Sequence, residues 1–127
     1  NVNSRVRVPS NSAFTFNSEF TVSLWAKFNR SWSYHSETLV WKTQHPATRY
    51  YISVNQDDSV FGAGKYGIGC AAYGIKPTKH IVNFSDISKW NHLACVYSAG
   101  TAKLYLNGVL VSSGSGTPNS SDITAII

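Results

Sequence analysis

The aromatic, acidic and cysteine side chains are the residues of this 127-residue chain that could carry chemistry. The polar stretch Arg30-Ser31-Trp32-Ser33-Tyr34-His35 holds a Trp and a Tyr two residues apart. Exposed aromatic faces stack on the C–H patches of sugar rings, and neighbouring polar groups bond the hydroxyls. Trp32, Tyr34 and His35 are therefore predicted to bind a carbohydrate. The alternative is that Trp32 folds back over the end of the domain as an apolar plug.

Two residues outside this segment are candidate helpers in ligand binding. Arg49 is a cation, and Tyr66 is an aromatic residue flanked by glycines. We expect Arg49 to supply polar contacts and Tyr66 a further stacking surface.

The acidic residues do not favour hydrolysis. A glycosidase needs two carboxylates at a defined separation, and none of the six acidic residues belongs to an alternating acidic cluster: Glu19, Glu37, Asp57, Asp58, Asp86 and Asp122. His92 and Cys95 are three residues apart, so on a strand they face opposite sides and cannot pair locally. The sequence predicts a protein that is not an enzyme.

A metal and a disulfide are both left open. Asp57 and Asp58 could supply oxygen ligands to Ca²⁺, although paired Asp in a turn usually serves only the turn. Calcium is thus a candidate cofactor but not a required one. Cys70 and Cys95 allow at most one internal disulfide, and their positions alone do not decide whether they pair.

The elements that must position these residues are strands, because apolar residues alternate with polar ones and keep no helical period. Asn107-Gly108 is typical of a type I′ hairpin, since both central residues need positive φ. The segment 20–27 has bulk on both faces, which predicts a strand that runs through the middle of a sandwich. The other predicted strands are 5–8, 38–42, 50–54, 60–63, 66–72 and 80–84, followed by a three-stranded meander over 90–111 and a last strand beginning at Ile123.

Charge and hydropathy argue against nucleic-acid binding and against membrane insertion. The formal charge is +5, but the basic residues are scattered, which does not favour nucleic-acid binding and suits acidic glycans better. Since no run approaches the roughly 18 apolar residues of a membrane helix, we expect no membrane insertion. One domain is expected at this length.

The strand sequences resemble one family in order along nearly the whole chain. FTVSLWAKF, TLVWKTQ, YYISV and KWNHLACVYSAGTAKLYLNGVLVSSGSG are similar to the laminin-G-like and pentraxin-like domains of the concanavalin A-like lectin/glucanase superfamily. The resemblance implies an all-β fold, an antiparallel jelly-roll β-sandwich of two sheets. It also implies that Trp90-Asn91-His92 and Asn107-Gly108 are architectural.

Several family features are missing from this sequence. Cys95 matches a pentraxin cysteine, but the partner would lie near Ser23 to Trp25, where there is no Cys. The pentraxin-type calcium ligands would fall near Ala47-Thr48, where no acidic pair occurs, and the Glu-x-Asp-x-x-Glu strand of the glucanases is also absent. These differences disfavour a glucanase or a pentraxin-type calcium site.

The resemblance further implies that residues 1–127 are a single laminin-G-like domain lacking the family's closing C-terminal strand. An open sheet edge invites strand addition, so we expect a fragment of a longer chain or a partner at that edge. The expected function is recognition or adhesion at the cell surface or outside the cell, with a glycan or glycoprotein as partner. The alternative is a structural or protein-interaction domain that binds no glycan.

Overall fold

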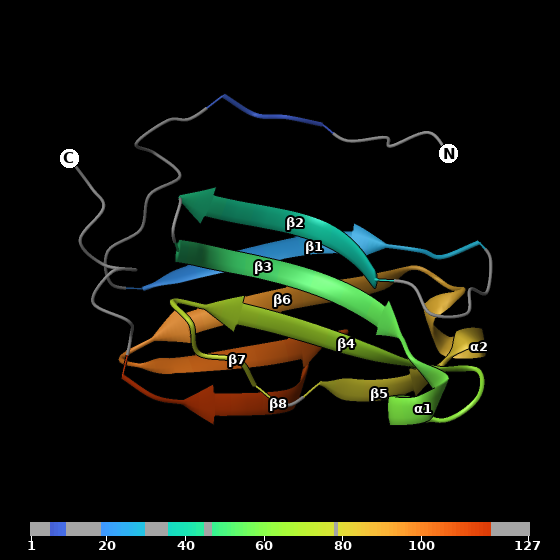
Figure 1. Ribbon diagram of the computed structural model, residues 1–127. Helices are drawn as coiled ribbons and strands as arrows, with labels where there is room; N and C mark the ends of the chain where they lie inside the picture. Colours follow the sequence, from blue (N-terminus) through green and yellow to red (C-terminus); the bar gives the residue numbers. More distant parts are fainter. Residues whose placement is uncertain (1–5, 10–18, 30–35, 45–46, 78, 118–127) are drawn as a thin grey trace.

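The computed structural model describes residues 6–9, 19–29, 36–44, 47–77 and 79–117 (Figure 1). Eight strands and two one-turn helices lie within them. The strands are β1 (Phe20–Ala26), β2 (Ser36–Gln44), β3 (Ala47–Gln56), β4 (Lys65–Ala72), β5 (His80–Asn83), β6 (Asn91–Ser98), β7 (Thr101–Leu106) and β8 (Val109–Ser115). The helices are α1 (Asp58–Phe61) and α2 (Phe84–Ile87).

The strands form two antiparallel sheets that pack face to face, as Figure 1 shows. One sheet has the order β1-β6-β7-β8 and the other the order β2-β3-β4-β5. They are called sheet A and sheet B below. Contacts between them join β4 to β6 and β7, and β3 to β6. The predicted all-β sandwich is therefore confirmed.

Alternation along the central strands builds the core. On β3, Ile52 and Val54 are almost fully buried between the sheets, and β4 contributes Tyr66 and Ile68 from the next strand. Burial of this apolar surface is the main favourable term in folding. From sheet A and the adjoining segments the same cluster receives Phe28, Ile87, Leu93, Cys95 and Leu104.

Three predicted elements differ from the structure. Residues 60–63 were expected to be a strand, but Asp57 caps α1 by accepting a hydrogen bond from the Ser59 N–H at 3.0 Å, and this turns the chain into a helix. Val6 and Val8 lie outside the strands and are 93% and 66% exposed. They bury too little surface to stabilise a strand.

The strand β1 also differs from expectation, because it lies at the end of the described order of sheet A and not in the middle. The bulky residue on the second face of β1 is Trp25, which is 65% exposed. Its ring centroid lies 5.3 Å from that of His92. The strand expected from Ile123 lies outside the described residues. The described part of the chain has no helix with the length and hydrophobicity of a membrane span.

The meander β6-β7-β8 forms as predicted, and the side chains of Asn91 and Asn107 stabilise it through hydrogen bonds. Asn107 and Gly108 have φ of 52° and 82°, as a type I′ turn requires. The Asn107 side chain accepts from the His92 N–H at 2.9 Å and donates to Asn91 Oδ1 at 2.8 Å. Asn91 Nδ2 in turn donates to the carbonyls of Asp86 and Lys89, each at 2.9 Å. Asn91 and His92 of the Trp-Asn-His motif, and the Asn-Gly turn, thus have a structural role.

Replacing Asn91 with Ala should lower the free energy of unfolding by about 3 kcal/mol, because the carbonyls of Asp86 and Lys89 and the Asn107 amide lose their partner in a nearly buried site. Urea denaturation measures this change. The exposed residue Ser113 on β8 provides the control, since Ser113→Ala should stay within about 0.5 kcal/mol of wild type. A loss below about 1 kcal/mol for Asn91→Ala would show that the network contributes little.

Candidate functional site

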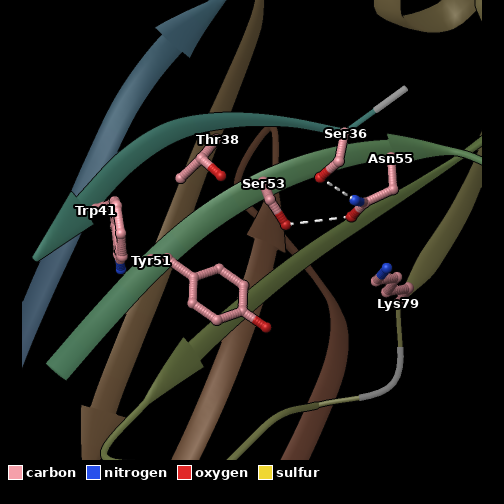
Figure 2. Close-up of a pocket in the computed structure, with 7 residues that line it drawn as sticks. All are labelled: Ser36, Thr38, Trp41, Tyr51, Ser53, Asn55 and Lys79. Atoms are coloured by element: carbon pink, nitrogen blue, oxygen red, sulfur yellow. Dashed lines mark hydrogen bonds between the residues drawn. The ribbon is translucent and has the colours of Figure 1, made fainter. Parts of the chain in front are cut away.

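An open groove of about 320 Å³ lies on the outer face of sheet B (Figure 2). Because Ile52 and Val54 face the core, the alternating residues Tyr51, Ser53 and Asn55 of β3 must face outward. The groove is lined by these three residues together with Ser36, Thr38, Trp41 and Lys79.

Strand register places the lining residues in rows across the sheet. Trp41 of β2 pairs with Tyr51 of β3. The next row toward the other end joins Thr38 to Ser53, and the third joins Ser36 to Asn55. Cross-strand neighbours on one face have Cβ atoms about 5 Å apart, so each row presents two side chains together to the groove.

A β-bulge puts Trp41 on the groove side. The register of β2 against β3 shifts between Thr38 and Val40, so Leu39 is an extra residue without a partner. Leu39 and Val40 both pack against the core. Strict alternation from Thr38 would have turned Trp41 inward. The extra residue reverses this alternation and points Trp41 outward.

Glycines on β4 let two side chains from elsewhere lie flat against the sheet. Gly67 and Gly69 pair with Asn55 and Ser53. A Cβ at Gly67 would lie 2.6 Å from Cζ of Phe61, and one at Gly69 would lie 3.1 Å from Cγ of Lys79. The Lys79 ammonium is 5.5 Å from the centroid of the Phe61 ring, a cation–π contact. The side chains of Phe61 and Lys79 therefore lie over Gly67 and Gly69 on the outer face of β4, and Lys79 lines the groove.

Two hydrogen bonds, drawn as dashed lines in Figure 2, orient the side chains at the polar end of the groove. Ser53 Oγ donates to Asn55 Oδ1 at 3.3 Å, and Asn55 Nδ2 donates to Ser36 Oγ. Ser53 is only 6% exposed. Two hydroxyls and an amide are thus held in place before any ligand arrives, which reduces the entropy lost on binding.

The aromatic end of the groove is formed by Trp41 and Tyr51, opposite Lys79 in Figure 2. Trp41 is 63% exposed although it is a large apolar residue. Burial raises the pKa of the Tyr51 phenol. The phenol therefore stays protonated at neutral pH and can donate a hydrogen bond.

Stacking, hydrogen bonding and one positive charge are the chemistry that this lining offers. None of the seven residues that line the groove is a carboxylate. Glu37 stands between Ser36 and Thr38 on β2, but it pairs with the inward-facing Val54 and so belongs to the opposite face. The lining described here lacks the acid and base that glycoside hydrolysis uses.

The structure tests one of the five predicted ligand residues, Tyr66. Tyr66 is 0% exposed within the core, so its predicted role as a stacking surface is wrong. The glycines around it open the outer face of β4, whereas its own side chain points inward. Arg49 lies in β3, one strand residue before Tyr50, but its side chain is outside the described set. Trp32, Tyr34 and His35 lie outside the described residues and stay predictions.

The predicted calcium residues have local hydrogen-bonding roles. Asp57 caps α1, and Asp58 Oδ1 accepts from Gln56 Nε2 at 3.1 Å. Gln56 Oε1 is buried without a hydrogen-bond partner. Across the described residues, no three His, Cys, Asp or Glu side chains gather into a metal-binding group. Calcium at Asp57 and Asp58 stays a prediction.

The groove residues were not predicted from the sequence. Tyr51, Ser53 and Asn55 could have been found, because they alternate with Ile52 and Val54 in a strand whose apolar half must face the core. Trp41 could not, since its orientation depends on the bulge.

A comparison with protein families matches residues 1–125 to a laminin G model described as the concanavalin A-like lectin/glucanases superfamily. The match covers nearly the whole chain. Comparisons with curated proteins and with solved structures gave no match. Family membership thus agrees with the sandwich, while the groove has to be interpreted from its own residues.

Gly67→Ala should lower the free energy of unfolding by about 2 kcal/mol, because the new methyl group collides with the ring of Phe61. Urea denaturation tests this, with Gly116→Ala as the control, since its Cβ would meet Ile75 at an ordinary 3.6 Å. In a Phe61→Ala background the cost of Gly67→Ala should fall by half or more. An equal cost in both backgrounds would show that the ring of Phe61 does not restrict position 67.

Proposed function

The chain belongs to the concanavalin A-like lectin/glucanases superfamily, and on that premise we propose that it is a non-enzymatic recognition or adhesion module that binds carbohydrate in the groove of sheet B. The observation that carries this proposal is the pairing of Trp41 with Tyr51 beside a fixed set of hydroxyl and amide groups. A sugar ring needs both kinds of surface, an aromatic face for its C–H patch and polar groups for its hydroxyls.

The size of the groove suits a short saccharide. Its volume of about 320 Å³ lies at the lower end of the ~300–1,000 Å³ of small-molecule sites. A ring stacked on Trp41 and Tyr51 directs its hydroxyls along β3, toward Ser53 and Asn55 in the next two rows. The open sides allow a longer glycan to continue beyond the groove.

The charge in the groove favours acidic over neutral sugars. Lys79 is the cation of the lining, and it is exposed. The lining places no carboxylate against it, and the whole chain carries +5. A uronate, sialyl or sulfate group would therefore gain an ion pair with Lys79, whereas a neutral sugar would gain only a hydrogen bond.

We further propose that the module works outside the cell or at its surface, as part of a larger protein. The absence of a carboxylate pair in the groove lining supports binding without turnover.

Protein binding through the other sheet is a second candidate function. Trp25 is 65% exposed and Leu110 is 48% exposed on sheet A, with Tyr105 paired to Leu110 between them. Exposed aromatic side chains are enriched in protein interfaces. This face is separate from the groove, so variants at Trp25 and at Trp41 distinguish the two functions.

A glycan array should show binding that Trp41→Ala weakens at least tenfold, because one lost stacking contact costs about 1.4 kcal/mol or more. Trp90→Ala is the matched control, since Trp90 is 65% exposed, close to the 63% of Trp41, but does not line the groove. Parallel runs with Ca²⁺ and with a chelator test the calcium prediction.

Two outcomes would contradict the proposal. The first is a silent array with a protein that is shown to be folded, which would favour protein binding through sheet A. The second is an equal loss of binding in Trp41→Ala and Trp90→Ala, which would place the sugar elsewhere on the surface.

A further inference from the structure

We propose that Cys70 and Cys95 form a disulfide bond between the two sheets, and that this bond is made while the chain folds under oxidising conditions. The proposal is independent of the groove and of carbohydrate binding. The modification site lies in the core, in the cluster that receives the cysteines of β4 and β6.

Strand register brings the two cysteines to the same place from opposite sheets. Cys70 pairs with Ile52 and shares its inward face, and Cys95 pairs with Leu104 on the inward face of sheet A. The exposed fraction is 2% for Cys70 and 0% for Cys95. Both thiols therefore lie between the sheets within one core cluster.

One contact shows that the thiol of Cys70 reaches across the space between the sheets. Cys70 Sγ donates to the carbonyl of Lys103 on β7 at 3.9 Å, one residue before the Leu104 that pairs with Cys95. Both cysteines are free thiols in the structure. Closing a disulfide would bring the two sulfur atoms to about 2 Å, from side chains that already enter the same core cluster from facing strands.

Burial determines when the bond can form. The hydrogen bond to Cys95 raises the pKa of the Cys70 thiol, and desolvation raises it further. Thiol–disulfide exchange needs a thiolate and access to the oxidant, and the folded core offers neither. The bond must therefore form before the sheets close, when both thiols are exposed to solvent.

The oxidant is a small-molecule disulfide such as oxidised glutathione. The thiolate of one cysteine attacks a glutathione sulfur, which forms a mixed disulfide and releases one reduced glutathione. The second cysteine then attacks the protein sulfur of the mixed disulfide and releases the other. Two protein thiols are oxidised, one glutathione disulfide is reduced to two thiols, and both protons leave with the glutathione.

The experiment refolds the full chain from denaturant in two buffers, one with oxidised and reduced glutathione and one with dithiothreitol. Intact mass and alkylation in denaturant then count the thiols. After the glutathione buffer we expect two hydrogen atoms fewer and no alkylated cysteine. The melting temperature should be roughly 10 °C higher than in dithiothreitol, because the bond closes a loop of about 25 residues.

Two further samples make the test specific. The folded, reduced protein should stay reduced for hours in the glutathione buffer, because its thiols are buried. Cys70→Ala and Cys95→Ala should each lose the difference in melting temperature between the two buffers. If either variant fails to fold, the thiol count of the wild-type protein still decides.

Two alkylated cysteines after refolding in glutathione would overturn the proposal, as would a disulfide-linked dimer in place of the internal bond. Rapid oxidation of the folded protein would overturn its second half, that the bond is made during folding.

Discussion

The alternation of side chains along β3 is the constraint on which the rest of the structure depends. Ile52 and Val54 must be buried between the sheets, because their apolar surface supplies much of the driving force for the sandwich. Tyr51, Ser53 and Asn55 are thereby forced to the other face. A slip of one residue would bury the polar set and expose the apolar one. The energetics of the core therefore fix the positions of three groove residues.

The two faces of β4, the strand next to β3, also differ from each other, because its outward-facing positions carry almost no side chain. Gly67 and Gly69 weaken β4 as an isolated strand, but they let Phe61 and Lys79 lie against the sheet. The inward residues Tyr66 and Ile68 offset this weakness by filling the core. The ring of Phe61 from α1 and the side chain of Lys79 before β5 thus cover the outer face of β4, where the strand has no side chains of its own.

Much of the fold could be predicted from the sequence, because its signals are local. Asn107-Gly108 sets the type I′ turn, and the flanking alternation sets the pairing of β6, β7 and β8. The strand expected at 60–63 was wrong because one capping side chain, Asp57, decided the local structure against the hydrophobic pattern. A single hydrogen bond of this kind is hard to weigh against a run of apolar residues in the sequence.

The candidate site was predicted less well, since its main residue depends on a long-range pairing. The orientation of Trp41 follows from an extra residue in β2, and a bulge is defined only against the partner strand. Both Leu39 and Val40 have a place in the core, so the bulge gains apolar burial while it exposes a tryptophan. An exposed tryptophan loses the stabilisation that its burial would bring. A ligand that covers its face in the groove would recover part of that lost burial, which connects the packing of β2 to recognition.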